Sequence, residues 1–294
     1  MVTPNRIPVI DNIRTAVESG NFNDKVELND PTLTPDERKY ILNKYIHVRK
    51  SPFFRVTNWV AGRMADIATW NINRNTEIIG LENIKNIKGG AFITSNHFNP
   101  DENTVIRLLS QKMKRGNLYV MSQDSNLKMK GLFGFFLYYM DIIPVSQDME
   151  YMKKQIDRLI DEAIGSGQNI LIYPEQEMWF NYRKPRPLKR GAYYLASKHN
   201  VPVISCFVEI KDLPEMETDE FHKVKYILHV LKPIFPDSTK SNHINSIEMA
   251  KTDYEQKKEA YEKAYNKPLD YTFTPWDIAG WEPGENSFNE FYNL

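Results

Sequence analysis

The sequence predicts an α/β fold with a largely parallel central sheet flanked by helices. After residue 75, short runs rich in β-forming residues alternate with stretches of helical periodicity, as is typical of βαβ units around a parallel sheet. The 294 residues are enough to bury a sizeable core, and a composition of 41% hydrophobic and 26% charged residues is ordinary for a globular protein. The single cysteine, Cys206, excludes an internal disulfide.

The N-terminal part differs from the rest of the chain in composition. The first thirty residues are polar and punctuated by proline, so we expect an irregular arm there. A helix should begin after Thr34, which can cap it, with Pro35 in the first turn and Glu37 completing a capping box.

A second helix is predicted over residues 53–70, where apolar residues recur at spacings of three and four. These apolar positions are Phe53, Val56, Val60, Met64 and Ile67. Two interpretations remain open, because the helix could pack on the α/β core or lie in a membrane interface, where Trp59, Trp70, Arg55 and Arg63 would suit it.

The remaining elements follow in order. Strands are expected at residues 77–80, 91–95, 118–121, 141–145, 169–173, 201–208 and 224–231, and helices near 102–114, 149–164, 189–198 and 246–265. An aromatic tail containing Trp276, Trp281 and Phe291 ends the chain. We therefore predict an N-terminal arm with amphipathic helices over residues 1–75 and an α/β domain over residues 76–294.

The charge and hydropathy of the sequence limit the partners that we expect it to bind. The 38 basic residues equal the 38 acidic residues, so no global field indicates nucleic acid. The N-terminus lacks the apolar segment of a signal peptide. The longest uncharged apolar run, residues 131–140, is about half the length needed to cross a bilayer. We expect a cytoplasmic protein without a spanning helix.

The segment 91–103 is the first candidate site. An apolar strand ends at Ser95, Asn96 and His97 follow, and the acidic residues Asp101 and Glu102 open a helix. An imidazole can act as a general base near neutral pH, and a carboxylate bonded to its other nitrogen fixes the tautomer. An alternative stays open, because Asn99, Pro100 and Glu102 also suit a helix cap.

The segment 168–190 is the second candidate site. An apolar strand ends in Pro174-Glu175-Gln176-Glu177, and aromatic residues and the cations Arg183, Lys184, Arg186, Lys189 and Arg190 follow. Aromatic surface beside cations suits an amphiphile with an anionic head group. A solvated basic turn is the alternative.

These segments resemble the glycerolipid (lysophosphatidic acid) acyltransferases. Four blocks between Ile79 and Phe207 carry the resemblance in order. They are Ser95-Asn96-His97 with the acids after it, Gly131-Leu-Phe-Gly134 leading to Ile142-Ile-Pro-Val-Ser146, Ile172-Tyr173-Pro174-Glu175, and Val201-Pro202-Val203-Ile204.

The chain departs from the family pattern at three places. The position of the catalytic acid falls on Glu102, with Asp101 one residue early as the alternative. Val145-Ser146-Gln147-Asp148 has no arginine, and Gln176-Glu177-Met178 replaces Gly-Thr-Arg. The resemblance implies that, in the family, the residues replaced here hold the phosphate of the acceptor. Either Arg183, Lys184 and Arg186 replace them, or the acceptor is not a glycerol phosphate.

The resemblance implies an acyltransferase with His97 and Glu102 or Asp101 as catalytic residues. Its substrate-binding residues would be Asn96, Pro174, Glu175, Gln176, Glu177, Arg183, Lys184 and Arg186. It would use acyl-CoA or acyl carrier protein as the acyl thioester donor and a lysophospholipid-like or glycolipid-like acceptor. Neither a cofactor nor a metal is expected, and the enzyme would be peripheral on the inner face of the membrane in phospholipid biosynthesis.

Two other functions remain open. A non-catalytic lipid-binding protein on the same scaffold would explain the altered second and third blocks. A metal-dependent hydrolase with His97, Asp101, Glu175 and Glu177 as ligands is the other.

Overall fold

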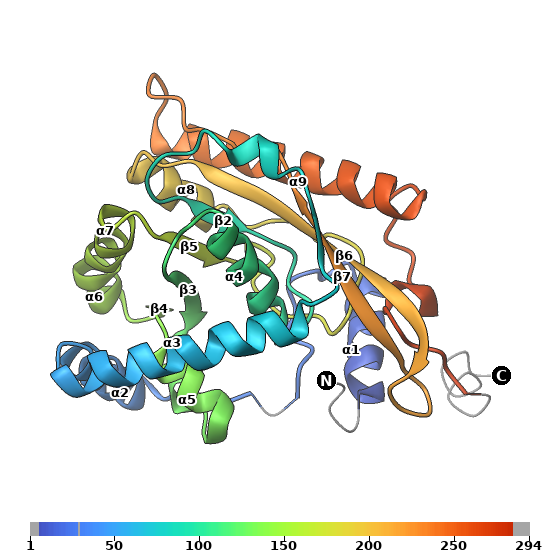
Figure 1. Cartoon of the computed structure of the whole chain (residues 1–294), viewed down its shortest axis with the longest axis horizontal. Coiled ribbons are helices and arrows are strands. Elements are labelled where there is room, and N and C mark those ends of the chain that lie inside the picture. Colours follow the sequence, from blue (N-terminus) through green and yellow to red (C-terminus); the bar gives the residue numbers. More distant parts are fainter. Residues whose placement is uncertain (1–5, 29, 285–294) are drawn as a thin grey trace.

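The computed structural model describes residues 6–28 and 30–284 and contains a seven-stranded sheet in the order β1-β7-β6-β2-β5-β3-β4 (Figure 1). The strands are β1 (Glu77–Ile79), β2 (Phe92–Thr94), β3 (Leu118–Gln123), β4 (Ile142–Val145), β5 (Asn169–Ile172), β6 (Val203–Met216) and β7 (His222–Val230). Among these seven strands of the described residues, β6 and β7 pair antiparallel and the other five pairs are parallel. The predicted fold class and the position of every predicted strand are confirmed.

Helices cover both faces of the sheet. They are α1 (Ile7–Glu18), α2 (Pro35–Val48), α3 (Pro52–Ile72), α4 (Glu102–Lys112), α5 (Gly131–Tyr139), α6 (Met149–Tyr151), α7 (Asp157–Gly165), α8 (Gly191–Lys198) and α9 (Asn242–Tyr265). Alternate residues of the central strands point to opposite faces. Ile93 and Leu171 join the core cluster that includes α4, whereas Phe92 and Ile170 join the cluster that includes α7, α8 and α9.

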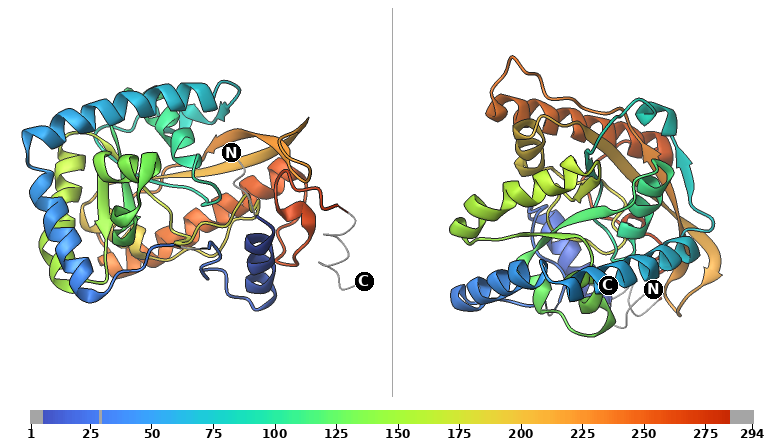
Figure 2. Two further views of the ribbon diagram at one scale, coloured as in Figure 1. Left: turned by 90° about the horizontal axis from the view of Figure 1, so that it is seen from below. Right: turned by 60° about the vertical axis from the view of Figure 1, so that its left-hand side comes forward.

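The expectation of an irregular N-terminal arm is wrong for residues 7–18, which form α1. Val9, Ile10, Ile13, Ala16 and Val17 recur at helical spacing and are buried. They pack against aromatic residues of the segment after β5 and of the C-terminal part, namely Trp179, Phe180, Tyr182 and Trp281. Figure 2 shows α1 beside the C-terminal segment. The polar residues between these apolar positions concealed the helix in the sequence.

The next helix begins as predicted. Thr34 caps α2, its hydroxyl accepts from the N–H of Glu37, and the carboxylate of Glu37 accepts from the N–H of Thr34. This reciprocal pair is the predicted capping box.

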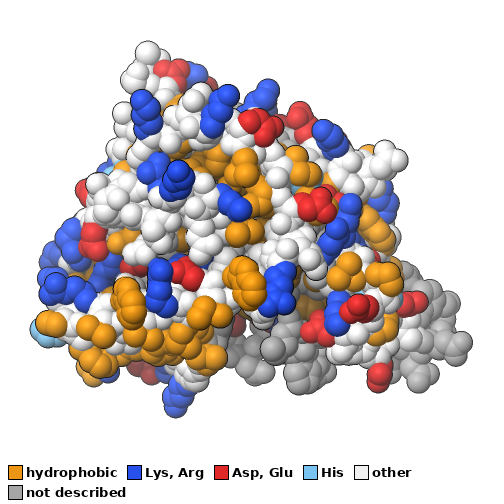
Figure 3. Space-filling model, in the orientation of Figure 1, with side chains coloured by type: hydrophobic (Ala, Val, Ile, Leu, Met, Phe, Trp, Pro, Cys, Tyr) orange, Lys and Arg blue, Asp and Glu red, His pale blue; other side chains and the backbone are white. Residues whose placement is uncertain are grey.

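Helix α3 turns its apolar stripe outward. Phe53, Val56, Trp59, Ile67 and Trp70 are each more than 60% exposed. The buried side of α3 carries Phe54, Ala61, Ala65 and Thr69 instead. In Figure 3 hydrophobic side chains gather at the lower left, over α3 and α5. Within the described ranges no helix is long and apolar enough to cross a membrane.

Candidate active site

His97 lies just beyond the carboxyl end of β2, where the parallel strand β5 also ends. Its peptide N–H donates to Oε2 of Glu175 over 3.2 Å, and its carbonyl accepts from the N–H of Trp179 over 3.0 Å. The backbone of His97 is thus held by the segment that follows β5. Ligand sites in open α/β sheets form at this edge.

Glu102 orients the imidazole ring. One carboxylate oxygen of Glu102, Oε1, contacts Nδ1 of His97. The other, Oε2, accepts from the peptide N–H of Phe98 over 2.6 Å and of Asn99 over 3.2 Å. Glu102 is 1% exposed and is the first residue of α4, where the helix dipole favours negative charge. The carboxylate is therefore immobilised, and a carboxylate in this position orients the imidazole through Nδ1.

The opposite ring nitrogen is available. In residues 6–28 and 30–284, Nε2 of His97 makes no hydrogen bond, and the side chain is 21% exposed. An imidazole with one nitrogen fixed by a carboxylate and the other accessible can accept a proton from a substrate.

Asp101 is not the partner of His97. Its peptide N–H donates to Oδ1 of Asn99 over 3.0 Å, and the carboxylate beside the imidazole is that of Glu102. The alternative assignment to Asp101 is therefore wrong. The helix-cap interpretation is confirmed in part, because Oδ1 of Asn99 accepts from the N–H of Asp101 and Oε2 of Glu102 accepts from the N–H of Asn99. The helix α4 itself begins at Glu102 without a side-chain cap from Asp101.

Tyr173 covers one face of the imidazole. The two ring centroids lie 4.0 Å apart and the planes differ by 7°. The Tyr173 hydroxyl donates to Oδ1 of Asn103 over 2.7 Å. Burial raises the pKa of Tyr173 well above its usual value, so this hydroxyl stays protonated. The sequence indicates Tyr173 only as part of the block Ile172-Tyr173-Pro174-Glu175. The feature that could have placed it at the site is its position at the end of β5, the strand next to β2.

Glu175 and Arg186 form a buried ion pair behind the site. Their side chains are 2% and 1% exposed, and Nη2 of Arg186 lies 2.9 Å from Oε2 of Glu175. Arg186 also donates to the carbonyls of Phe22, His97 and Glu177. The charged groups of both side chains have internal partners, and their predicted substrate-binding role stays a prediction.

Arg183 and Lys184 are likewise bonded to intramolecular partners. Arg183 binds both carboxylate oxygens of Asp212, over 2.7 and 2.6 Å. Lys184 Nζ donates to Asp277 Oδ2 over 3.0 Å and to the carbonyl of Thr272 over 2.8 Å. Their side chains are 4% and 3% exposed. Both cations already have intramolecular partners, and their expected role in binding an acceptor phosphate stays a prediction.

Asn96 has a structural role. Its amide donates to the carbonyl of Val208 and accepts from the N–H of Val208, over 3.0 and 2.8 Å. These bonds tie the segment after β2 to β6, and the predicted contact of Asn96 with substrate stays a prediction. Pro174 is buried, and its carbonyl accepts from the N–H of Lys189 over 2.8 Å.

Gln176 and Glu177 are the more accessible members of the predicted set. Gln176 is exposed and has a left-handed backbone with φ 72°. Glu177 is half-buried, and its Oε1 accepts from the amide of Gln123 over 2.9 Å. Their binding roles stay predictions.

The N-terminal segment closes the site from one side, which the sequence did not indicate. Asn23 donates to the carbonyl of Glu175 over 3.1 Å, and Trp179 Nε1 donates to the carbonyl of Asp24 over 2.9 Å. The largest contribution to the pKa of Glu27 is burial, which raises it, while Arg6 and His97 oppose that shift. Glu27 thus lies within electrostatic range of His97.

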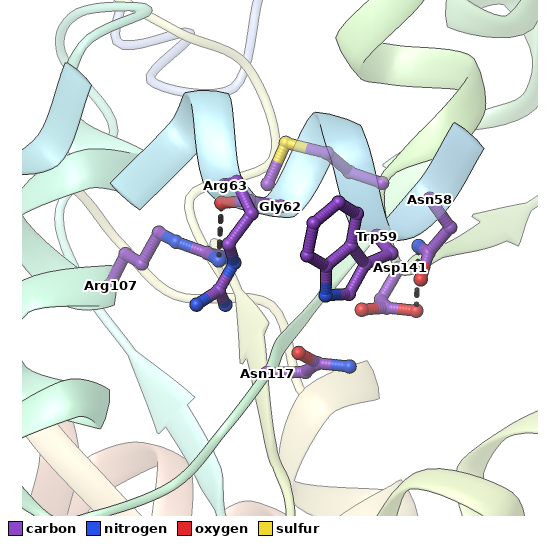
Figure 4. Close-up of a pocket in the computed structure, with 8 residues that line it drawn as sticks. Asn58, Trp59, Gly62, Arg63, Arg107, Asn117 and Asp141 are labelled. Atoms are coloured by element: carbon purple, nitrogen blue, oxygen red, sulfur yellow. Dashed lines mark hydrogen bonds between the residues drawn. The ribbon is translucent and has the colours of Figure 1, made fainter. Parts of the chain in front are cut away.

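A separate cavity of about 80 Å³ lies between α3 and α4 (Figure 4). Figure 4 shows Arg63 and Arg107 pointing toward one another beside Gly62. Its lining residues are Asn58, Trp59, Gly62, Arg63, Arg107, Asn117, Met140 and Asp141. None of the predicted site residues is among them.

A metal centre has no support in the described ranges. No three His, Cys, Asp or Glu residues there lie close enough to hold an ion. The set His97, Asp101, Glu175 and Glu177 accordingly does not form such a group.

The chain is similar to one family model and to a solved structure. Residues 75–209, which include His97, Glu102 and Arg186, match the family model described as Acyltransferase. The solved structure of the 1-acyl-sn-glycerophosphate (LPA) acyltransferase PlsC from Thermotoga maritima is similar, with 18% sequence identity and a TM-score of 0.47. That similarity covers 89% of this chain and 97% of the other. No curated protein matches the sequence.

Proposed function

We propose that the chain moves a fatty acyl group from an acyl thioester to a lipid hydroxyl, because residues 75–209 match the family model described as Acyltransferase. The acceptor is lysophospholipid-like or glycolipid-like, and the donor is acyl-CoA or acyl carrier protein. The observation that carries this proposal is the His97 ring, whose Nδ1 is held by Glu102 while Nε2 is accessible.

The chemistry follows from that geometry. Nε2 of His97 removes the proton from the acceptor hydroxyl, and the oxygen attacks the thioester carbonyl. The tetrahedral intermediate collapses with cleavage of the carbon–sulfur bond, and the imidazolium returns its proton to the leaving thiolate. Glu102 stabilises the imidazolium while it exists. General-base assistance of this kind contributes about 10²–10⁴-fold in rate.

The burial of the basic cluster bears on the acceptor. Arg183, Lys184 and Arg186 are each engaged with an internal carboxylate. Rearranging Lys184 or Arg186 toward a substrate would leave the carboxylate of Asp277 or Glu175 buried without its partner, which is strongly unfavourable. This supports an acceptor that is not a glycerol phosphate over one whose phosphate these three cations grip.

The outward face of α3 supports contact with a membrane surface. Its exposed aromatic residues Phe53, Trp59 and Trp70 suit the interface, and Arg74 lies 4.3 Å from the ring of Trp70. An amphipathic helix of this composition lies in the plane of the interface. In this proposal α3 docks the enzyme on the inner face of the membrane and brings the site to its lipid substrates.

An acyl-transfer assay tests the proposed reaction. The purified full chain would be given acyl-CoA or acyl carrier protein thioesters in vesicles containing lysophosphatidic acid, monoacylglycerol or a lysoglycolipid, with products identified by mass. We expect transfer to at least one acceptor and its loss in His97→Ala. A His97→Ala variant with full activity would remove the assignment. Absence of thioester consumption with every acceptor would favour the non-catalytic lipid-binding protein.

Vesicle flotation tests the membrane contact separately. We expect a Phe53→Ser, Trp59→Ser variant to lose binding. The matched control is Phe235→Ser, because Phe235 is 61% exposed and lies outside α3. Equal binding by both variants would contradict the proposed role of α3.

A further inference from the structure

Tyr173 joins three elements at the site. It follows β5 directly, its ring lies on the imidazole of His97 after β2, and its hydroxyl binds Asn103 in the first turn of α4. Asn103 is the neighbour of Glu102, which holds Nδ1 of the same imidazole. The imidazole is thus fixed at its edge by a carboxylate and on its face by an aromatic ring.

The face of the Tyr173 ring can stabilise a charged imidazole. The two ring planes are nearly parallel, with 4.0 Å between centroids, so the imidazole lies over the face of the Tyr173 ring. A cation within about 6 Å of an aromatic centroid is attracted to the face of that ring. Tyr173 therefore stabilises the imidazolium relative to the neutral ring, in addition to restricting its rotation.

We propose that Tyr173 is a positioning residue for His97, with two separable parts. The aromatic face orients the imidazole and stabilises the imidazolium formed as the acceptor is deprotonated. The hydroxyl anchors that face to α4 through Asn103. This inference rests on the proposed role of His97 as general base.

The test compares Tyr173→Leu, which removes the face, with Tyr173→Phe, which removes only the hydroxyl. The full chain is assayed for kcat/KM against pH, and thermal unfolding reports folding. In the Leu variant we expect a loss on the order of 10²-fold at neutral pH, from a displaced base. We also expect its acidic limb to move to lower pH by about half a unit to one unit, because the imidazolium loses its attraction to the face. The Phe variant should keep the acidic limb at its wild-type pH and lose about tenfold or less in kcat/KM.

Asn103→Ala provides a test outside the core, since Asn103 is only half-buried. It should reproduce the Phe variant, and the double variant should be no worse than either single one. The proposal is overturned if a folded Tyr173→Leu variant keeps the acidic limb of its kcat/KM profile at the wild-type pH. It is also overturned if the losses in kcat/KM of Tyr173→Phe and Asn103→Ala add fully in the double variant. Failure of the wild type to transfer, or full activity of His97→Ala, would instead refute the proposed function.

Discussion

Two acid–base pairs meet at the carboxyl edge of β2 and β5, and they differ in access. The pair Glu175–Arg186 is 2% and 1% exposed, and every carboxylate and guanidinium contact is internal. In the pair His97–Glu102 the acid is 1% exposed but the imidazole is 21% exposed, with Nε2 unbonded to any described residue. The residue types are suited to catalysis in both pairs. Only the second leaves a basic atom that a substrate can reach.

The two pairs are also connected. Glu175 accepts from the peptide N–H of His97, and Arg186 donates to the His97 carbonyl over 3.4 Å. The buried pair therefore supports the backbone of the accessible one. Its role is to hold the site in place, which is why changes in the two pairs should affect different quantities.

The largest expected effect is on catalysis, through Glu102→Gln. A glutamine amide can face Nδ1 with its N–H and impose the wrong tautomer, so we expect kcat to fall by about 10³–10⁴-fold. The matched control is Asp101→Asn, since the carboxylate that contacts Nδ1 of the imidazole belongs to Glu102. Steady-state rates at saturating acceptor provide the measurement. Equal losses in both variants would break the distinction between these acids.

The next effect is on stability, through Arg186→Met. It leaves the Glu175 carboxylate buried without its partner, so unfolding in urea should show a loss of about 3–5 kcal/mol. The double variant Glu175→Gln, Arg186→Met should recover part of that loss, because the uncompensated charge is gone. Unchanged stability with loss of acceptor binding would show that Arg186 contacts substrate after all.

A smaller effect is expected at Asn96, next to the accessible pair but engaged with β6. Asn96→Ala leaves the N–H and carbonyl of Val208 without their partners, which should cost about 1–3 kcal/mol in urea unfolding. The folded fraction should keep near wild-type KM for the acceptor. A large rise in KM without a change in stability would support the substrate-binding role.

The smallest effect concerns a pair on the surface, Asp157 with Lys198. The hydrogen bond from Lys198, 2.6 Å long, is the largest cause that lowers the pKa of Asp157, and His199 adds to it. A lowered pKa in the folded state stabilises the protein above the unfolded pKa of about 3.9. That contribution is lost as the pH falls through the folded value.

Asp157→Asn should therefore cost about 0–1 kcal/mol at neutral pH, since Asp157 is 35% exposed and solvent screens the pair. Urea midpoints of the variant and the wild type should converge as the pH falls below 4. A difference that grows on acidification would have the wrong sign for this pair.

The sequence by itself determined the strands, the capping box at Thr34 and the imidazole–acid pair. All seven predicted strands are present, although β6 continues past residue 208 to Met216, where Glu209, Lys211 and Asp212 concealed the antiparallel ribbon with β7. These features were predictable because propensity, capping and the spacing of His97 and Glu102 are local and act over a few residues.

Tertiary structure decided which side chains are accessible. The apolar stripe of α3 points outward, and the cations Arg183, Lys184 and Arg186 point inward. Their partners Asp212, Asp277 and the segment around Phe22 are distant in sequence. Periodicity shows that a helix has two faces but not which face is covered, since burial depends on contacts between remote segments. For the same reason, only the folded chain brings Tyr173 onto the ring of His97.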